Sequence, residues 1–198
     1  MKNNELEYVP FFNECQFFII KLFNIYFKTV GLISSINHST LLTDNMTNKQ
    51  MTLVSLTSLN LDVFFKFIYD KHDIEELVRA LIIKQYNTSN IGIIPSSKID
   101  DCTKEFCNLT IGKFKNFIET VACGHLRINI PINVCSANID MQTASGFKNK
   151  HQHFYWKIMI GKLKFICGMD IYLNDSVDLK LLNKLKLTSQ DDGFIEIL

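Results

Sequence analysis

The chain has 198 residues, of which 47% are hydrophobic and 12% aromatic, and its formal net charge at pH 7 is +1. This length suits one domain with a sizeable core, and the apolar content argues against disorder over most of the chain. Acidic and basic residues balance, and no long run of one sign occurs. We therefore do not expect a nucleic-acid-binding protein.

Cysteine usage and the N-terminal residues bear on the compartment. The six cysteines form no C-x-x-C pair, and the first ten residues are too polar for a signal peptide. Both features predict reduced thiols in a cytoplasmic protein. Lys21, Asn24 and Lys28 interrupt the apolar stretch 17–33, which is therefore no uninterrupted membrane span of about 20 residues. We interpret it as an amphipathic helix with a wide buried face.

The first half of the chain is expected to form a helix, two short strands and two further helices. Pro10 suits the first turn of a helix. Thr, Val, Leu and Ser bounded by turn residues predict strands, and apolar residues three and four apart predict helices. The expected elements are a helix from Pro10 to about Lys28 or Val30, strands 39–44 and 50–58, helices 62–69 and 73–84, and a loop at 86–97.

The second half is expected to begin with a long helix and to continue mainly as strands. Gly124 is a suitable stop for a helix over 98–123, and Gly161-Lys162 predicts a tight hairpin. The strands are expected at 126–134, 137–143, 152–160 and 163–173, followed by a helix at 178–187 and a polar tail. The predicted fold is an α/β (α+β) domain over 1–174, with 175–198 as a C-terminal helix and tail. Its largely antiparallel sheet of about six strands is packed by the two long helices.

Residues 101–121 of the long helix carry the main functional signal. Projected on a wheel, the half expected to face the core holds Cys102, Phe106, Leu109, Phe114, Phe117, Ile118 and Val121. Asp101, Glu105, Asn108 and Gly112 fall within about 60° on the other side. Glu105 and Asn108 lie one turn apart and point the same way. A helical glycine costs about 1 kcal/mol relative to alanine, so Gly112 suggests close approach of another backbone. A solvated face without function is the alternative.

The pattern D-x-x-x-E-x-x-N-x-x-x-G, from Asp101 to Gly112, resembles the signature of the CheX/CheC chemotaxis phosphatases. The resemblance spans about 8–173. Three other segments are similar to the family in the same order: 8–11 opening the first helix, 58–64 as a strand-to-helix entry, and 127–131 in a late strand. The chain departs from the family at 39–58, which lacks the usual glycines, and after Pro131, where Cys135-Ser-Ala-Asn-Ile-Asp replaces a glycine-bearing turn.

The resemblance implies a phosphatase for the aspartyl phosphate of a CheY-type response regulator. Hydrolysis of such an acyl phosphate needs mainly a positioned water and charge compensation. By resemblance, Asn108 would orient the water and Glu105 would pair with the regulator's lysine. Asp101 and Gly112 would contact the partner, and Mg²⁺ would be held by the regulator, with no cofactor or metal in this chain. The family also implies a homodimer.

Two other functions remain open from the sequence. The first is a binding module of the same fold without activity, like the middle domains of flagellar switch proteins. An acid and an amide kept side by side at Glu105 and Asn108 argue against it. The second is a membrane-peripheral protein that uses the Phe-rich first helix. Burial of Phe17, Phe18 and Phe23 would exclude this second function.

Histidine and cysteine candidates are weaker. His151 and His153 share one strand face, as two metal ligands would, but the sequence offers no third ligand. Cys107 has His125 elsewhere in the chain, yet no nucleophile motif surrounds it. We interpret the histidines as surface residues and Cys107 as a buried thiol.

Overall fold

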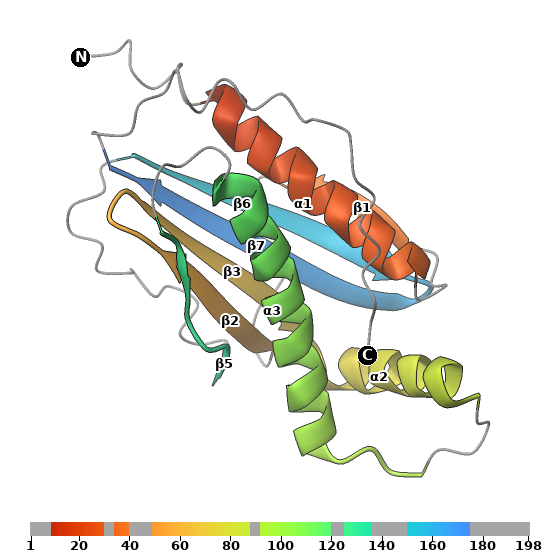
Figure 1. Cartoon of the computed structure of the whole chain (residues 1–198). Coiled ribbons are helices and arrows are strands. Elements are labelled where there is room, and N and C mark those ends of the chain that lie inside the picture. The colour runs from red at the N-terminus through yellow and green to blue at the C-terminus, as the bar shows by residue number, and fades with distance from the viewer. Residues whose placement is uncertain are drawn as a thin grey trace.

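The computed structural model describes residues 9–29, 34–39, 49–87, 92–119, 125–135 and 150–174. They form one antiparallel sheet with three helices on one of its faces (Figure 1). In chain order the elements are α1 (Val9–Thr29), β1 (Ser34–Ser39), β2 (Gln50–Thr57), β3 (Leu61–Tyr69), α2 (Lys71–Tyr86), α3 (Ser96–Glu119), β4 (Arg127–Ile128), β5 (Ile132–Cys135), β6 (Lys150–Ile160) and β7 (Leu163–Leu173).

The strand order is β1-β6-β7-β3-β2-β4, and β5 also pairs with β2. Both β4 and β5 pair with the outer edge of β2, so together they form one interrupted edge strand. Leu56 pairs with Ile128 and Leu53 with Ile132, so three steps along β2 face four steps along the edge strand. This extra residue is a β-bulge. Pro131 lies within it, where a residue without an N–H is tolerated. The expected six-stranded antiparallel sheet is confirmed.

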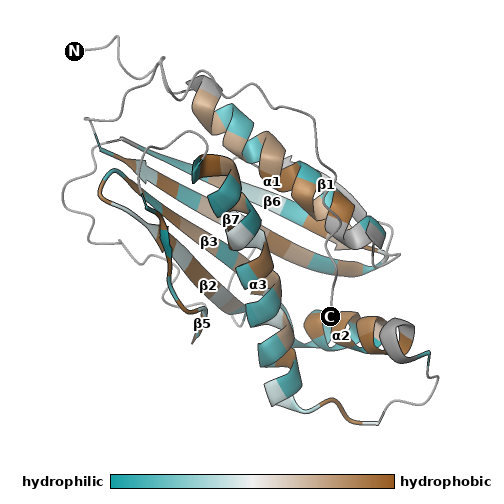
Figure 2. Ribbon diagram, viewed as in Figure 1, coloured by the Kyte–Doolittle hydropathy of each residue, from teal (hydrophilic) through white to brown (hydrophobic). Residues whose placement is uncertain are grey.

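The core lies between the sheet and the helices. The strand residues that face the helices are almost entirely apolar, and Figure 2 shows brown, hydrophobic segments along β2, β3 and β7, which contribute to this core. Its centre is aromatic: Phe106 of α3 stacks on Phe23 of α1, with ring centroids 5.6 Å apart, and contacts Phe67 of β3 at 4.8 Å. Helix α2 adds Ile74, Leu77 and Val78 to this core, so three helices pack on the sheet instead of two.

The prediction of a helix over 62–69 was wrong, and so was the strand-to-helix entry at 58–64. The segment is β3, which pairs with β2 and β7 along its whole length. Phe64 and Ile68 on the other face supplied the apolar residues that imitate helical spacing. On the face without helices, side chains of β2 and β7 bury Ile68 and Lys66, so the sequence of β3 does not alternate cleanly between apolar and polar residues.

The other elements agree with the prediction to different degrees. The first helix is confirmed by α1, the long helix by α3, and the hairpin at Gly161 by β6 and β7, with a positive φ of 61°. The strand expected at 39–44 overlaps β1 only at Ser39, and the strand expected at 126–134 is divided by the bulge. Residues 40–48, 120–124, 136–149 and 175–198 lie outside the described residues, and with them the strand at 137–143 and the C-terminal helix and tail.

Helix α1 has the wide buried face expected of it. Phe23 is fully buried and Phe18 half-buried against α3, while Phe17 is 56% exposed. A membrane-peripheral role would be excluded if all three residues were buried, but only Phe23 is fully buried and Phe17 is exposed. Among the described residues, no helix combines the length and the hydropathy that a bilayer span requires.

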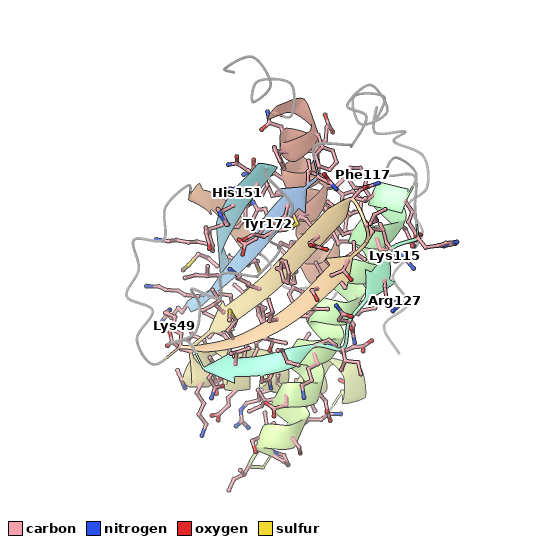
Figure 3. The ribbon with its side chains drawn as sticks, turned by 90° about the vertical axis from the view of Figure 1, so that its left-hand side faces the viewer. Lys49, Lys115, Phe117, Arg127, His151 and Tyr172 are labelled. Carbon is pink, nitrogen blue, oxygen red and sulfur yellow. The ribbon has the colours of Figure 1, made fainter. Side chains whose placement is uncertain are left out.

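The face of the sheet that the helices leave uncovered, which Figure 3 turns toward the viewer, carries a compact polar cluster. Lys66 of β3 and Asp170 of β7 form an ion pair at 2.5 Å, with side chains only 7% and 4% exposed. His153 Nδ1 donates to the other oxygen of Asp170 at 2.8 Å, because an ionised carboxylate can only accept. Burial alone would raise the pKa of Asp170, but the His153 hydrogen bond and the charge of Lys66 lower it below its ordinary value.

Candidate functional site

Helix α3 is anchored on the sheet by an apolar side that differs in part from the predicted one. Phe106, Phe114 and Ile118 are buried as expected, whereas Cys102, Leu109 and Phe117 are only half-buried, and Val121 lies outside the described residues. The buried set is Ile99, Thr103, Phe106, Cys107, Thr110, Ile111, Phe114 and Ile118.

Buried polar contacts fix how α3 is rotated on the sheet. The Tyr69 hydroxyl hydrogen-bonds with Thr52 on β2, at 3.2 Å, and the buried Thr103 of α3 lies beside it. Thr52 in turn donates to the side-chain oxygen of Asn133 on β5, at 2.9 Å, and Cys107 Sγ lies 3.9 Å from the Thr52 carbonyl oxygen. Buried hydroxyls must be paired, so these contacts favour one rotation of the helix. The sequence reasoning missed this network, because Thr52, Tyr69 and Thr103 lie far apart in the chain.

The side of α3 that faces away from the sheet carries the four predicted site residues. Asp101 and Glu105 are exposed, and Asn108 is half-buried. A Cβ added to Gly112 would meet nothing within 4 Å, so no packing among the described residues requires a glycine there. Within the described ranges, the side chains of Asp101, Glu105 and Asn108 have no hydrogen-bond or ion-pair partner. The structure therefore brings the acid and the amide together on one accessible surface.

Asn108 points toward a particular border of the sheet. Phe106 and Phe117 of α3 contact α1, where Phe117 stacks on Phe18 with centroids 4.3 Å apart. Residues two apart on a helix point about 160° away from each other, so Asn108 points away from α1. Since α1 covers the β6 side and α3 covers β2 and β3, the direction away from α1 leads to β4 and β5 (Figure 1).

The position of Lys115 also indicates the direction in which Asn108 points. It follows Asn108 by two helical turns and therefore projects from the same side of α3. Figure 3 places Lys115 and Arg127 of β4 at the border of the sheet opposite His151. The amide of the candidate site is thus oriented toward the β4–β5 edge strand.

The remaining candidates do not form a site. His153 is occupied by Asp170, and His151 stacks on Tyr172 with ring centroids 5.9 Å apart. Among the described residues, no three His, Cys, Asp or Glu side chains gather as metal ligands would. Cys107 is fully buried, and burial raises the pKa of its thiol, which is opposite to what a nucleophile needs. The interpretation of Cys107 as a buried thiol is confirmed.

Chemically, the arrangement offers a carboxylate and a carboxamide one turn apart on an open surface. The carboxylate can pair with a cation of a partner, and the amide can both donate to a water and accept from it. Glu105 is exposed and Asn108 half-buried, so the described residues leave both groups accessible. The surface is therefore suited to a macromolecule that brings its own reactive group.

Comparisons with known proteins agree with this architecture. No family model matches the sequence, and no curated protein matches it. Among solved structures, the chain is similar to the chemotaxis protein CheX from Vibrio vulnificus, with a TM-score of 0.54, 11% identity, and coverage of 78% of this chain and 95% of that one.

Two further solved structures have the same fold. One is CheX in the CheX–CheY–BeF3–Mg²⁺ complex from Borrelia burgdorferi, with a TM-score of 0.51, 9% identity, and coverage of 87% of this chain and 99% of that one. The other is a chemotactic CheC-like protein from Shewanella oneidensis, with a TM-score of 0.50, 12% identity, and coverage of 84% and 98%. The chain therefore has the fold of the CheX and CheC-like chemotaxis proteins.

Proposed function

We propose that this protein dephosphorylates the aspartyl phosphate of a CheY-type response regulator in chemotaxis-type signalling. The observation that carries the proposal is the pair Glu105 and Asn108. Both project from the free side of α3, without partners within the described residues, in a fold similar to that of CheX. The Borrelia burgdorferi relative is a CheX in complex with CheY, which supports a receiver domain as the partner.

In this proposal the regulator supplies the phosphoryl group and its Mg²⁺, and this chain supplies positioning. Glu105 pairs with a lysine of the regulator and sets the docked orientation. Asn108 then holds a water in line with the phosphorus atom. The water oxygen bonds to phosphorus and the bond between phosphorus and the aspartyl oxygen breaks, which restores the carboxylate of the regulator's aspartate. Inorganic phosphate leaves and carries the proton of the water. Asp101 contributes negative charge to the docking surface, and Gly112 leaves room for the partner's backbone.

Two parts of the proposal rest on the family resemblance. One is a homodimer, which light scattering on the purified protein can measure. The other is a cytoplasmic location, where response regulators and reduced thiols are both found. Neither affects the chemistry assigned to Glu105 and Asn108.

The test is release of inorganic phosphate from a panel of phosphorylated receiver domains, with wild-type protein and with Asn108→Ala. We expect the wild type to accelerate release from at least one receiver, and the variant to lose about 10²-fold or more of that acceleration. Because Asn108 lies outside the core, the variant's affinity for the receiver and its melting temperature should stay close to those of the wild type. A wild type that binds a receiver without accelerating release would favour the non-catalytic binding module instead.

A further inference from the structure

The edge strand next to the candidate site exposes an unusual amount of apolar surface. Ile128, Ile130 and Ile132 are 36%, 86% and 49% exposed, within five consecutive positions. Single exposed apolar residues are normal in proteins, but three of them close together along one edge indicate a surface for interaction.

The bulge distributes these side chains around the border of the sheet. Ile128 pairs with Leu56, which is part of the core, so Ile128 lies on the helix side. Ile132 pairs with Leu53. Thr52, the residue before Leu53, faces α3, so Leu53 and Ile132 point to the face of the sheet without helices. Ile130 lies between them, within the bulge. The three isoleucines thus wrap around the edge instead of lining one face.

The same geometry argues against strand addition as the use of this edge. β4 has two residues and β5 has four, with Pro131 and the bulge between them. An incoming strand needs a regular row of free N–H and C=O groups, which a bulge and a proline interrupt. The exposed isoleucines are therefore better suited to side-chain contacts with a partner than to backbone pairing with a second copy.

The neighbouring Glu105–Asn108 site indicates which partner the exposed isoleucines bind. A stable protein interface buries about 800 Å² on each partner, which is more than Asp101, Glu105, Asn108 and Gly112 can supply. The footprint must extend past α3 on one side, and Asn108 points toward the β4–β5 border. Interfaces commonly join an apolar patch to a polar rim. The isoleucines and the acid–amide pair supply these two components.

We propose that Ile128, Ile130 and Ile132 form a docking ledge for the receiver domain whose phosphoryl group is presented to Asn108. The proposal rests on the proposed function, because it identifies the partner of that same site. It requires a receiver with an apolar patch beside its phosphorylation pocket and a cation within reach of Glu105. The ledge contributes binding only, since it does not touch the reacting atoms.

The test compares Ile130→Asp with Phe17→Asp, a matched control on the exposed side of α1. The probe is a receiver domain that the wild type binds, activated with beryllofluoride and Mg²⁺. We expect Ile130→Asp, and also Ile132→Asp, to weaken binding by about tenfold or more, while Phe17→Asp leaves it unchanged. In phosphate release, the KM should rise while kcat at saturating receiver stays unchanged. Since Ile130 is 86% exposed, its replacement should leave the melting temperature unchanged.

Three results would overturn the ledge. The first is unchanged affinity in both isoleucine variants. The second is a change of oligomeric state in Ile130→Asp with unchanged affinity per protomer, which would assign the edge to a second copy. The third is a wild type that binds no receiver of the panel, and this would also reject the proposed function. A wild type that binds a receiver without hydrolysis rejects only the proposed phosphatase, because the binding comparison still tests the ledge.

Discussion

A bulky substitution at Gly112 should have different effects on activity depending on whether this side of α3 docks a partner or has no function. Space around Gly112 is open, so a leucine side chain would fit in the free protein. Leucine is the better helix former, and Gly112→Leu should raise the free energy of unfolding by up to about 1 kcal/mol. If a partner's backbone passes over this turn, the same side chain blocks docking.

We therefore expect Gly112→Leu to melt at the same temperature as the wild type or higher, and to lose acceleration of phosphate release. Gly112→Ala is the control, because its small side chain adds helix propensity with little bulk. A stable leucine variant with full activity would place the partner elsewhere on the molecule.

Glu105 is assigned a charge pair, and charge pairs respond to salt. Glu105→Gln keeps the size and hydrogen-bonding capacity of the side chain and removes only its charge. We expect weaker receiver binding at low ionic strength and a smaller difference from the wild type at about 0.5 M salt, where screening is strong. Titration of both proteins at several salt concentrations measures this. Parallel salt dependence of the two proteins would remove Glu105 from the interface.

At the scale of elements, β7 needs a glycine opposite Tyr155 of the neighbouring strand β6. Gly168 pairs with Tyr155, and a Cβ on residue 168 would lie 2.8 Å from Cε1 of that ring. Tyr155 is half-buried beside Lys66 and Asp170, which limits how far its ring can move away. Gly168→Ala should therefore lower the free energy of unfolding by about 1–3 kcal/mol, as overpacking does.

Urea denaturation of Gly168→Ala, Tyr155→Ala and the double variant measures this effect as a cycle. The alanine at 168 should cost much less when the ring at 155 is already absent. An equal cost in both backgrounds would mean that the clash with Tyr155 is not its cause.

Comparison of elements shows which of them the sequence could predict. α3 has one buried side and one polar side, so helical periodicity identified it and placed Glu105 and Asn108 on its free side. β3 has buried residues at both odd and even positions, so its pattern of apolar residues does not distinguish a strand from a helix. The bulge at Pro131 depends on the pairing of β4 and β5 with β2, which local sequence does not reveal. The orientation of Asn108 toward that edge depends on the packing of Phe106 and Phe117 against α1.

At the scale of the whole molecule, the buried pair Lys66–Asp170 links stability to pH. The pKa of Asp170 is lowered from its ordinary value of 3.8, so its contribution to stability is fully present above that value. The contribution is lost as the pH falls through the lower folded pKa. Lys66→Met should leave Asp170 with His153 alone, lower the free energy of unfolding by about 3 kcal/mol at pH 7, and shift acid unfolding to higher pH.

Urea denaturation from pH 2 to pH 8 provides the measurement. The double variant Lys66→Met/Asp170→Leu is the control, because it removes both charges and should recover much of the lost stability. If the single variant unfolds in acid at the same pH as the wild type, the pair does not set acid stability.

The strand order has a consequence for the time at which this protein can fold during synthesis. β3 lies in the middle of the sheet, and its partner on one side is β7, where Val63 pairs with Ile171, 108 positions later in the chain. Until β6 and β7 leave the ribosome, one edge of a strand rich in Phe remains without its neighbour. Such an edge is prone to pairing with other nascent chains. We expect the growing chain to need a chaperone until β7 has left the ribosome and paired with β3.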